Sequence, residues 1–357
     1  MLIYFLLYGI IAFSFLFGYT HYDDKKKTSR SVGMVAFGLL IILLSLRHPT
    51  MGVDLGHQNT VGYLPSFEVI AKLPWKTIFT MDGFKNYEAG YIVLNKLIGS
   101  IAIDRQFFLF CMAILSLVPI MHTVYKKSES PLFSFIIFMG LPLIQMFFSG
   151  MRQIIAIAIC TIALRFIEDK KIIRFIACVL FATLFHYSAI IFLIAYPAFH
   201  FKATLQSRIF SFLLLPFIYI FRTPLFLVLS RVLKDEAIPD NNGAVALMLL
   251  FLAIYLFCVV FTNYSKQQTG YINLFYIACI CQMFSGIYST AMRAGYYFMI
   301  AAIFALPSIV AGLQNDNTRR VCRLAIGCGF ILFSFSLLSS DSFAASNPYY
   351  FFWENRF

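Results

Sequence analysis

The chain has 357 residues, of which 61% are hydrophobic and only 12% are charged. This composition excludes an ordinary soluble domain, in which about a quarter of the residues are charged. The formal net charge of +12 does not indicate nucleic-acid binding, because the basic residues are scattered a few per loop and form no single block.

Apolar runs joined by short polar loops predict an all-α integral membrane protein, since a helix needs about 20 apolar residues to cross a bilayer. The first run, 2–20, is expected to remain as a span because it lacks the basic start and the cleavage site of a signal peptide. We predict about twelve transmembrane helices in one bundle, at residues 2–20, 31–46, 106–125, 131–148, 151–167, 172–185, 187–200, 209–222, 243–263, 270–289, 293–312 and 321–339.

The basic residues of the short loops predict the orientation of these helices, because cytoplasmic loops are enriched in lysine and arginine. The loops agree only if 87–103 is a re-entrant or interfacial helix on the outer side, preceded by a second interfacial stretch at 63–81. They also require 171–201 to be a hairpin that turns near His186. The result is a single transmembrane domain, residues 1–357, with an outer loop at 47–105 and an outer tail at 340–357.

All eight cysteines lie in apolar segments, and none has the Cys-x-x-Cys spacing of a zinc or redox site. We therefore expect no disulfide, no metal and no cofactor.

Under this topology, the conspicuous polar residues of the apolar segments gather at the outer ends of helices or in the outer loops. Ionisable groups at membrane depth are costly, so each needs a structural or functional reason. The residues are Arg47, Asp54, Glu88, Arg152, Gln153, His186, Arg293, Tyr296 and Tyr297.

Arg47 begins a segment in which Pro49 and Gly52 predict a turn that could bring Asp54 back toward the arginine. The structural alternative is an arginine that reaches the lipid headgroups, with an aspartate that caps the turn.

Two further arginines are candidate ligands for phosphate or pyrophosphate. Arg152 and Gln153 begin a helix, where free N–H groups favour anions, although the pair could equally cap a tight hairpin. Arg293 is a candidate second clamp, with Tyr296 and Tyr297 as walls for a sugar; interfacial tyrosines are also common in any membrane protein.

His186 and Glu88 are candidates for proton transfer. The imidazole of His186 could act as a base or donate a hydrogen bond to phosphate, or it could be a packing residue. Glu88 could contact a sugar hydroxyl or simply favour the dipole of the helix it begins. Together with the arginines, these groups suit an anionic, lipid-linked substrate.

Five short motifs, in this order, are similar to those of the EpsG-like branch of the bacterial Wzy polysaccharide polymerases. They extend from residue 46 to residue 298 and so cover most of the chain. The motifs are Leu46-Arg47…Gly52-Val53-Asp54, Tyr87-Glu88-Ala89-Gly90-Tyr91 followed by Leu94-Asn95-Lys96, Gly150-Met151-Arg152-Gln153, Phe185-His186-Tyr187-Ser188-Ala189 and Arg293-Ala294-Gly295-Tyr296-Tyr297-Phe298.

The resemblance implies a metal-independent glycosyltransferase with a GT-C-like membrane fold. Such an enzyme joins oligosaccharide repeat units carried on undecaprenyl pyrophosphate, at the outer face of the bacterial inner membrane. Its expected partners are the lipid-linked donor and acceptor, the membrane lipids and, as a candidate, a chain-length regulator, with no nucleic acid. His186, Glu88 and Asp54 are then the candidate catalytic residues. The alternatives are an O-antigen ligase and a flippase or transporter of the same lipid-linked glycan.

Overall fold

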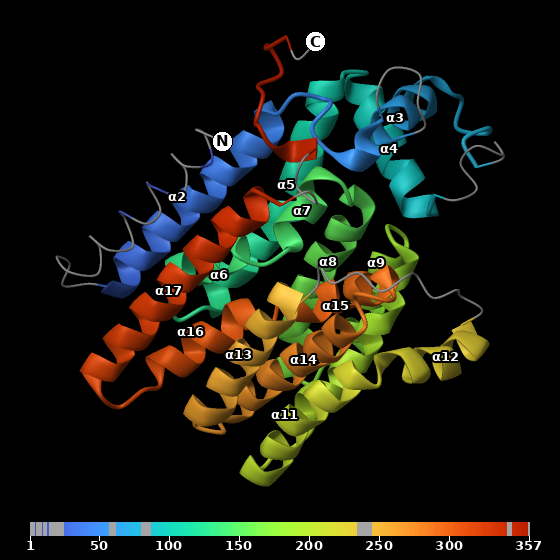
Figure 1. Ribbon diagram of the computed structural model, residues 1–357. Coiled ribbons are helices and arrows are strands. Elements are labelled where there is room, and N and C mark those ends of the chain that lie inside the picture. Colours follow the sequence, from blue (N-terminus) through green and yellow to red (C-terminus); the bar gives the residue numbers. More distant parts are fainter. Residues whose placement is uncertain are drawn as a thin grey trace. The chain divides into compact units, whose positions relative to one another are not determined.

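The computed structural model describes residues 25–56, 62–79, 87–233, 245–340 and 345–355, together with residues 4, 9 and 13. Within these ranges every regular element is a helix, apart from one isolated β-bridge (Figure 1). The predicted all-α class is therefore confirmed. The predicted first span, 2–20, lies outside the described residues except for positions 4, 9 and 13.

From the second segment onward each predicted segment overlaps a helix, but 131–148 and 293–312 are each divided into two helices, and one helix, at 222–233, lies largely in a predicted connection. The elements are α2 (Lys25–Leu46), η1 (Val53–Leu55), α3 (Tyr63–Lys72), α4 (Ala89–Ile101), α5 (Arg105–Lys127), α6 (Pro131–Met139), α7 (Leu143–Phe148), α8 (Met151–Glu168), α9 (Ile172–Thr183), η3 (Tyr187–Ile194), α10 (Ala195–His200), α11 (Leu205–Ile220), α12 (Arg222–Leu233), α13 (Val245–Phe261), α14 (Lys266–Met283), α15 (Ser289–Met299), α16 (Ala302–Ala311) and α17 (Asp316–Leu338).

Four stretches of helix in the described part of the chain are long and apolar enough to cross a membrane: Lys27–Leu46, Arg105–Lys127, Thr290–Ala311 and Asp316–Leu338. A fifth candidate is the pair Leu205–Ile220 and Arg222–Val228, which is bent by 81°. Several candidate spans are thus present, as expected of an integral membrane protein, but twelve are not shown.

The segments predicted to be interfacial or re-entrant contain short helices. α4 has 13 residues and α3 has 10, which correspond to about 20 Å and 15 Å at 1.5 Å per residue. Both are shorter than the hydrocarbon core of about 30 Å.

The predicted hairpin is also present, because the chain reverses between α9 and α10. The Phe175 ring lies 6.0 Å from that of Phe192 and 5.6 Å from that of Tyr196, measured between centroids. Two short helices therefore replace one long helix, and the turn contains His186.

The chain forms two compact units, which we describe separately. Unit 1 comprises residues 1–164, 176–190 and 323–357. In it, α2 packs against α5 and α6, and α3 packs against α4. Figure 1 shows α3 and α4 at the same end of α5 as the C-terminal tail. The Glu68–Arg105 ion pair, with Oε1 2.6 Å from Nε, ties α3 to the start of α5.

Unit 2 comprises residues 165–175 and 191–322. Its central helix is α14, which packs against α10, α11, α13, α15 and α16. Ser265 caps the start of α14 by accepting a hydrogen bond from the Gln268 N–H, at 3.3 Å.

Candidate functional site

An ion pair in unit 1 joins the starts of two helices. Glu88 directly precedes α4, and its Oε2 atom lies 2.7 Å from Nη1 of Arg152 in the first turn of α8. The two side chains are only 17% and 20% exposed, respectively. A charge-assisted hydrogen bond is strong in such a partly desolvated setting, so the pair fixes α4 against α8.

The second carboxylate oxygen of Glu88 reaches the turn after α9. Its Oε1 atom accepts a hydrogen bond from the Tyr187 N–H, at 3.1 Å. Beside it, the Tyr91 N–H donates to the Leu184 carbonyl oxygen, at 3.2 Å. A Cβ atom on Gly90 would lie 2.7 Å from both the Cβ and the carbonyl oxygen of Leu184, so only glycine permits this close approach. The glutamate therefore links α4, α8 and the His186 turn.

Two tyrosine rings contact the Arg152 side chain, and a third packs against both of them. Its guanidinium carbon lies 4.8 Å from the centre of the Tyr87 ring and 5.9 Å from that of Tyr63, within the range of cation–π attraction. The Tyr91 ring meets both others edge-on, with centroids 5.5 Å and 5.8 Å away. Burial raises the pKa of the Tyr63 hydroxyl, while the nearby Arg152 charge acts to lower it. We call Tyr63, Tyr87 and Tyr91 the tyrosine cluster.

His186 is half-buried, and hydrogen bonds to Ser188 orient its ring. Its Nδ1 atom lies 2.7 Å from Oγ of Ser188 and 3.3 Å from the Ser188 backbone nitrogen. A backbone N–H can only donate, so Nδ1 acts as an acceptor. In the neutral imidazole the proton is then on Nε2, which makes Nε2 a hydrogen-bond donor.

Asp54 lies on η1 with an exposed side chain, and its charge influences the hydroxyl of Tyr63. The preceding Gly52 has φ of 137°, and a Cβ atom there would collide with the Phe148 carbonyl oxygen. The Val53 N–H donates to Oγ of Ser149, at 3.1 Å. These contacts fix the turn that carries the aspartate.

Arg47 lies in the interior of unit 1, with 2% of its surface exposed. Its Nη1 atom donates to the Phe147 carbonyl oxygen at 2.7 Å, and its guanidinium covers the Phe148 ring at 5.0 Å. Burial lowers the pKa of Arg47 to about 10, so the side chain keeps its charge at pH 7. The arginine is thus buried against Phe147 and Phe148, whereas Asp54 is exposed.

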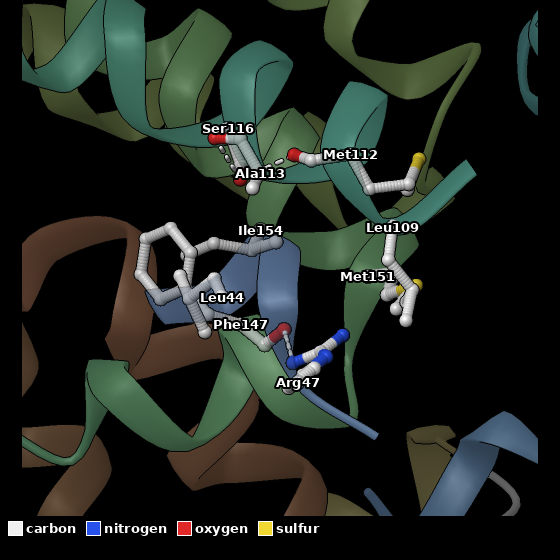
Figure 2. A pocket seen from close by; sticks show the side chains of 9 residues that line it. All are labelled: Leu44, Arg47, Leu109, Met112, Ala113, Ser116, Phe147, Met151 and Ile154. Atoms are coloured by element: carbon white, nitrogen blue, oxygen red, sulfur yellow. Dashed lines mark hydrogen bonds between the residues drawn. The ribbon is translucent and has the colours of Figure 1, made fainter. Parts of the chain in front are cut away.

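Arg47 borders a pocket whose other walls are largely apolar, as Figure 2 shows. The one hydroxyl in the lining, Ser116 Oγ, donates to the Met112 carbonyl oxygen at 2.6 Å. Such walls do not suit a phosphate or a sugar. The lining consists of Leu44, Arg47, Leu109, Met112, Ala113, Ser116, Phe147, Met151 and Ile154.

The C-terminal tail packs along the Arg47 segment. Phe351 forms an antiparallel bridge with Arg47, the His48 N–H donates to the Tyr350 carbonyl oxygen at 2.8 Å, and the Phe352 N–H donates to that of Leu46 at 3.0 Å. Tyr349 donates its hydroxyl to the Leu43 carbonyl oxygen at 2.6 Å. This contact was not predicted from the sequence, where the tail was expected only to lie outside.

The remaining predicted residues lie elsewhere. Gln153 is 3% exposed within α8. In unit 2, Arg293 is exposed on α15, whereas Tyr296 and Tyr297 are fully buried and offer no ring face to a sugar. Among the described residues, no group of three or more histidine, cysteine, aspartate or glutamate side chains could hold a metal ion.

The sequence matches the EpsG family over residues 30–352, which is most of the chain. The chain belongs to the EpsG family. No curated protein and no solved structure matches it. Membership of the EpsG family indicates a role in exopolysaccharide biosynthesis.

Sequence reasoning placed Glu88, Arg152 and His186 of this EpsG-family chain on one face, and unit 1 brings all three to one locality. It did not identify Tyr63 as part of the same group. The available signal was a tyrosine at the start of a short amphipathic segment, which is too common at membrane interfaces to be distinctive.

Proposed function

We propose that this EpsG-family protein is a polysaccharide polymerase that joins oligosaccharide repeat units carried on undecaprenyl pyrophosphate. The observation that carries the proposal is the Glu88–Arg152 pair, flanked by the tyrosine cluster and by His186 in one compact unit. A cation for the pyrophosphate and aromatic surfaces for sugars are what this reaction needs. The proposal includes about twelve spans, an inner-membrane location and a site at the outer face.

In the proposed reaction, a hydroxyl of the acceptor attacks the anomeric carbon of the donor. The bond between that carbon and the pyrophosphate oxygen breaks, and undecaprenyl pyrophosphate leaves. Arg152 stabilises the negative charge of this leaving group, and Nε2–H of His186 donates to a phosphate oxygen. Preorganised donors of this kind commonly contribute the largest part of a rate enhancement.

The contacts of Glu88 favour a positioning role over that of a base. Both of its oxygens are engaged, one with Arg152 and one with the Tyr187 N–H. In the neutral ring of His186, Nδ1 accepts the Ser188 N–H and Nε2 carries the proton, so the ring is suited to donate and not to accept a proton. Asp54, exposed and electrostatically coupled to Tyr63, is therefore the group we assign to accept the proton of the attacking hydroxyl.

The two rival functions have different requirements. An O-antigen ligase would use the same donor chemistry but transfer the glycan to a lipid A core. A flippase would need a polar passage to both faces, whereas Glu88, Arg152 and the His186 turn meet at one locality of unit 1. The test below distinguishes both of them from a polymerase.

The decisive test is gel analysis of surface glycan from a strain that lacks the protein. Loss of long chains, with single repeat units still displayed, supports a polymerase. Loss of all displayed units indicates a transporter or a ligase, and an unchanged ladder of chain lengths would overturn all three. Arg152→Ala should reproduce the deletion at normal protein levels, whereas Arg105→Ala, which breaks only the pair with Glu68, should retain long chains.

A further inference from the structure

The face of α9 that leads toward the Glu88–Arg152 pair is both exposed and apolar. Ile176, Leu180, Phe181 and Leu184 are between 38% and 53% exposed. Ile176 and Leu180 are four residues apart on the helix, and Leu184, directly after its last residue, continues the same stripe. The opposite side of α9 is buried, since Val179 and Ala182 are fully covered. We call these four exposed residues the α9 stripe.

The α9 stripe ends beside the charged pair. The carbonyl oxygen of Leu184 accepts the Tyr91 N–H, and three residues later the Tyr187 N–H donates to Glu88, which holds Arg152. An apolar track about 12 Å long, from Ile176 to Leu184, thus leads directly to a cation. A ligand that matches both features has a long hydrocarbon chain and an anionic head.

α9 is a short apolar helix that ends at a polar turn. The helix has 12 residues, about 18 Å, and the hairpin turn at its end contains His186. A helix of this length reaches only part of the way through a hydrocarbon core of about 30 Å. The stripe and the polar turn that follows it thus have the same order, apolar then polar, as the tail and head of a lipid-linked substrate.

We infer that the α9 stripe binds the polyprenyl chain of a lipid pyrophosphate whose head is held at Arg152. This inference rests on the proposed function and adds to it the place of the lipid tail. The exposed stripe on α11 provides the comparison, because Leu213 and Phe217 are 63% and 52% exposed but belong to unit 2, which does not contain Glu88 or Arg152.

The test is photocrosslinking with a benzophenone amino acid placed singly at Leu180, Leu184, Leu213 or Phe217. The purified full-length protein is reconstituted in phosphatidylcholine nanodiscs with undecaprenyl pyrophosphate as the probe, and adducts are identified by mass. Leu180 and Leu184 should give polyprenyl adducts at several times the yield of the α11 positions. Arg152→Ala should reduce that yield to the level of the controls.

Equal polyprenyl yields at all four positions, or phosphatidylcholine adducts alone on α9, would overturn the inference. Leu184 touches Gly90, so Leu180 provides the result if the larger side chain prevents folding at 184. If polyprenyl adducts form on α9 but deletion of the protein leaves the glycan ladder unchanged, the binding site for the tail stands and the polymerase function is rejected. If no adducts form but deletion removes the long chains, the polymerase function stands and the binding site for the tail is rejected.

Discussion

Glu88 and Arg152 are 64 residues apart in the sequence, and their charged groups meet at 2.7 Å at the starts of α4 and α8. Because the other oxygen of the same carboxylate holds the turn after α9, one side chain determines how three segments of unit 1 come together. The arginine is held by protein groups before any substrate arrives, as a preorganised site requires.

Replacing Glu88 with glutamine distinguishes positioning from base catalysis. Glutamine can still accept the Tyr187 N–H but removes the negative charge beside Arg152. We expect a lower yield of long glycan chains with partial activity retained, whereas removal of a general base costs about 10²- to 10⁴-fold. The measurement is in vitro polymerisation rate at equal protein amount, and Glu68→Gln serves as a control at the exposed pair with Arg105. If Glu88→Gln abolished polymerisation while Asp54→Asn remained active, Glu88 would not be a positioning residue and Asp54 would not be the base.

The charge-reversed double variant Glu88→Arg/Arg152→Glu separates folding from function. Each single change places like charges together and should destabilise unit 1. The double change restores an opposite pair and should recover much of the thermal stability, as coupled neighbours do. It should not recover polymerisation, because the cation then projects from α4 instead of α8. Full activity in the double variant would show that the position of the arginine is unimportant.

The close approach of α4 to the turn after α9 can be tested by adding one methyl group at Gly90. Gly90→Ala would place Cβ 2.7 Å from Leu184, so the helix must move away from the turn. Overpacking of this kind costs about 1–3 kcal/mol. Gly38→Ala, in α2 where nothing lies within 4 Å of the added atom, should be neutral or slightly stabilising. Thermal denaturation in detergent measures both, and similar melting temperatures would mean that the approach does not matter.

Much of the fold was predictable from the sequence because apolar periodicity and loop signals act locally. The predicted segments 106–125 and 151–167 correspond to α5 and α8 within a few residues. The break at His186 followed from the length of the segment together with the basic residues of the loops. The sequence did not show which helices are long enough to cross a membrane without a break. Breaks such as the 81° bend after α11 depend on how the helices pack, and packing leaves no local pattern.

The candidate site was predictable in its residue types but not in its pairing. Arg47 and Arg152 both stand at helix ends, and nothing in the sequence distinguishes an arginine that is buried from one that is accessible. The Arg47 guanidinium is covered by Phe147 and Phe148, about 100 residues away in the sequence, and its backbone pairs with Phe351 of the C-terminal tail. Contacts between residues so far apart leave no local pattern.

The two arginines should therefore respond differently to replacement. Arg47→Ala removes a hydrogen bond from a charged donor and a contact with Phe148 in a buried setting. We expect a loss of about 2 kcal/mol or more of stability and a lower amount of folded protein. Arg152→Ala should mainly reduce polymerisation. Fluorescence-detected size-exclusion chromatography reports the folded amount, and an Arg47→Ala protein that is normally folded but inactive would favour a direct role in binding.

The C-terminal tail docks through backbone hydrogen bonds. Two variants at Phe352 can separate the contribution of one such bond from that of the side chain. Its N–H donates to the Leu46 carbonyl oxygen at 3.0 Å, while its side chain is 43% exposed. Phe352→Pro removes the donor, whereas Phe352→Ala keeps it and deletes only the exposed ring. A backbone hydrogen bond contributes about 0.5–1.5 kcal/mol, so the proline variant should release the tail more often. Limited chymotrypsin digestion should then cleave the tail several times faster in Phe352→Pro than in Phe352→Ala. Equal cleavage of the two would show that ring packing holds the tail instead of the backbone ladder.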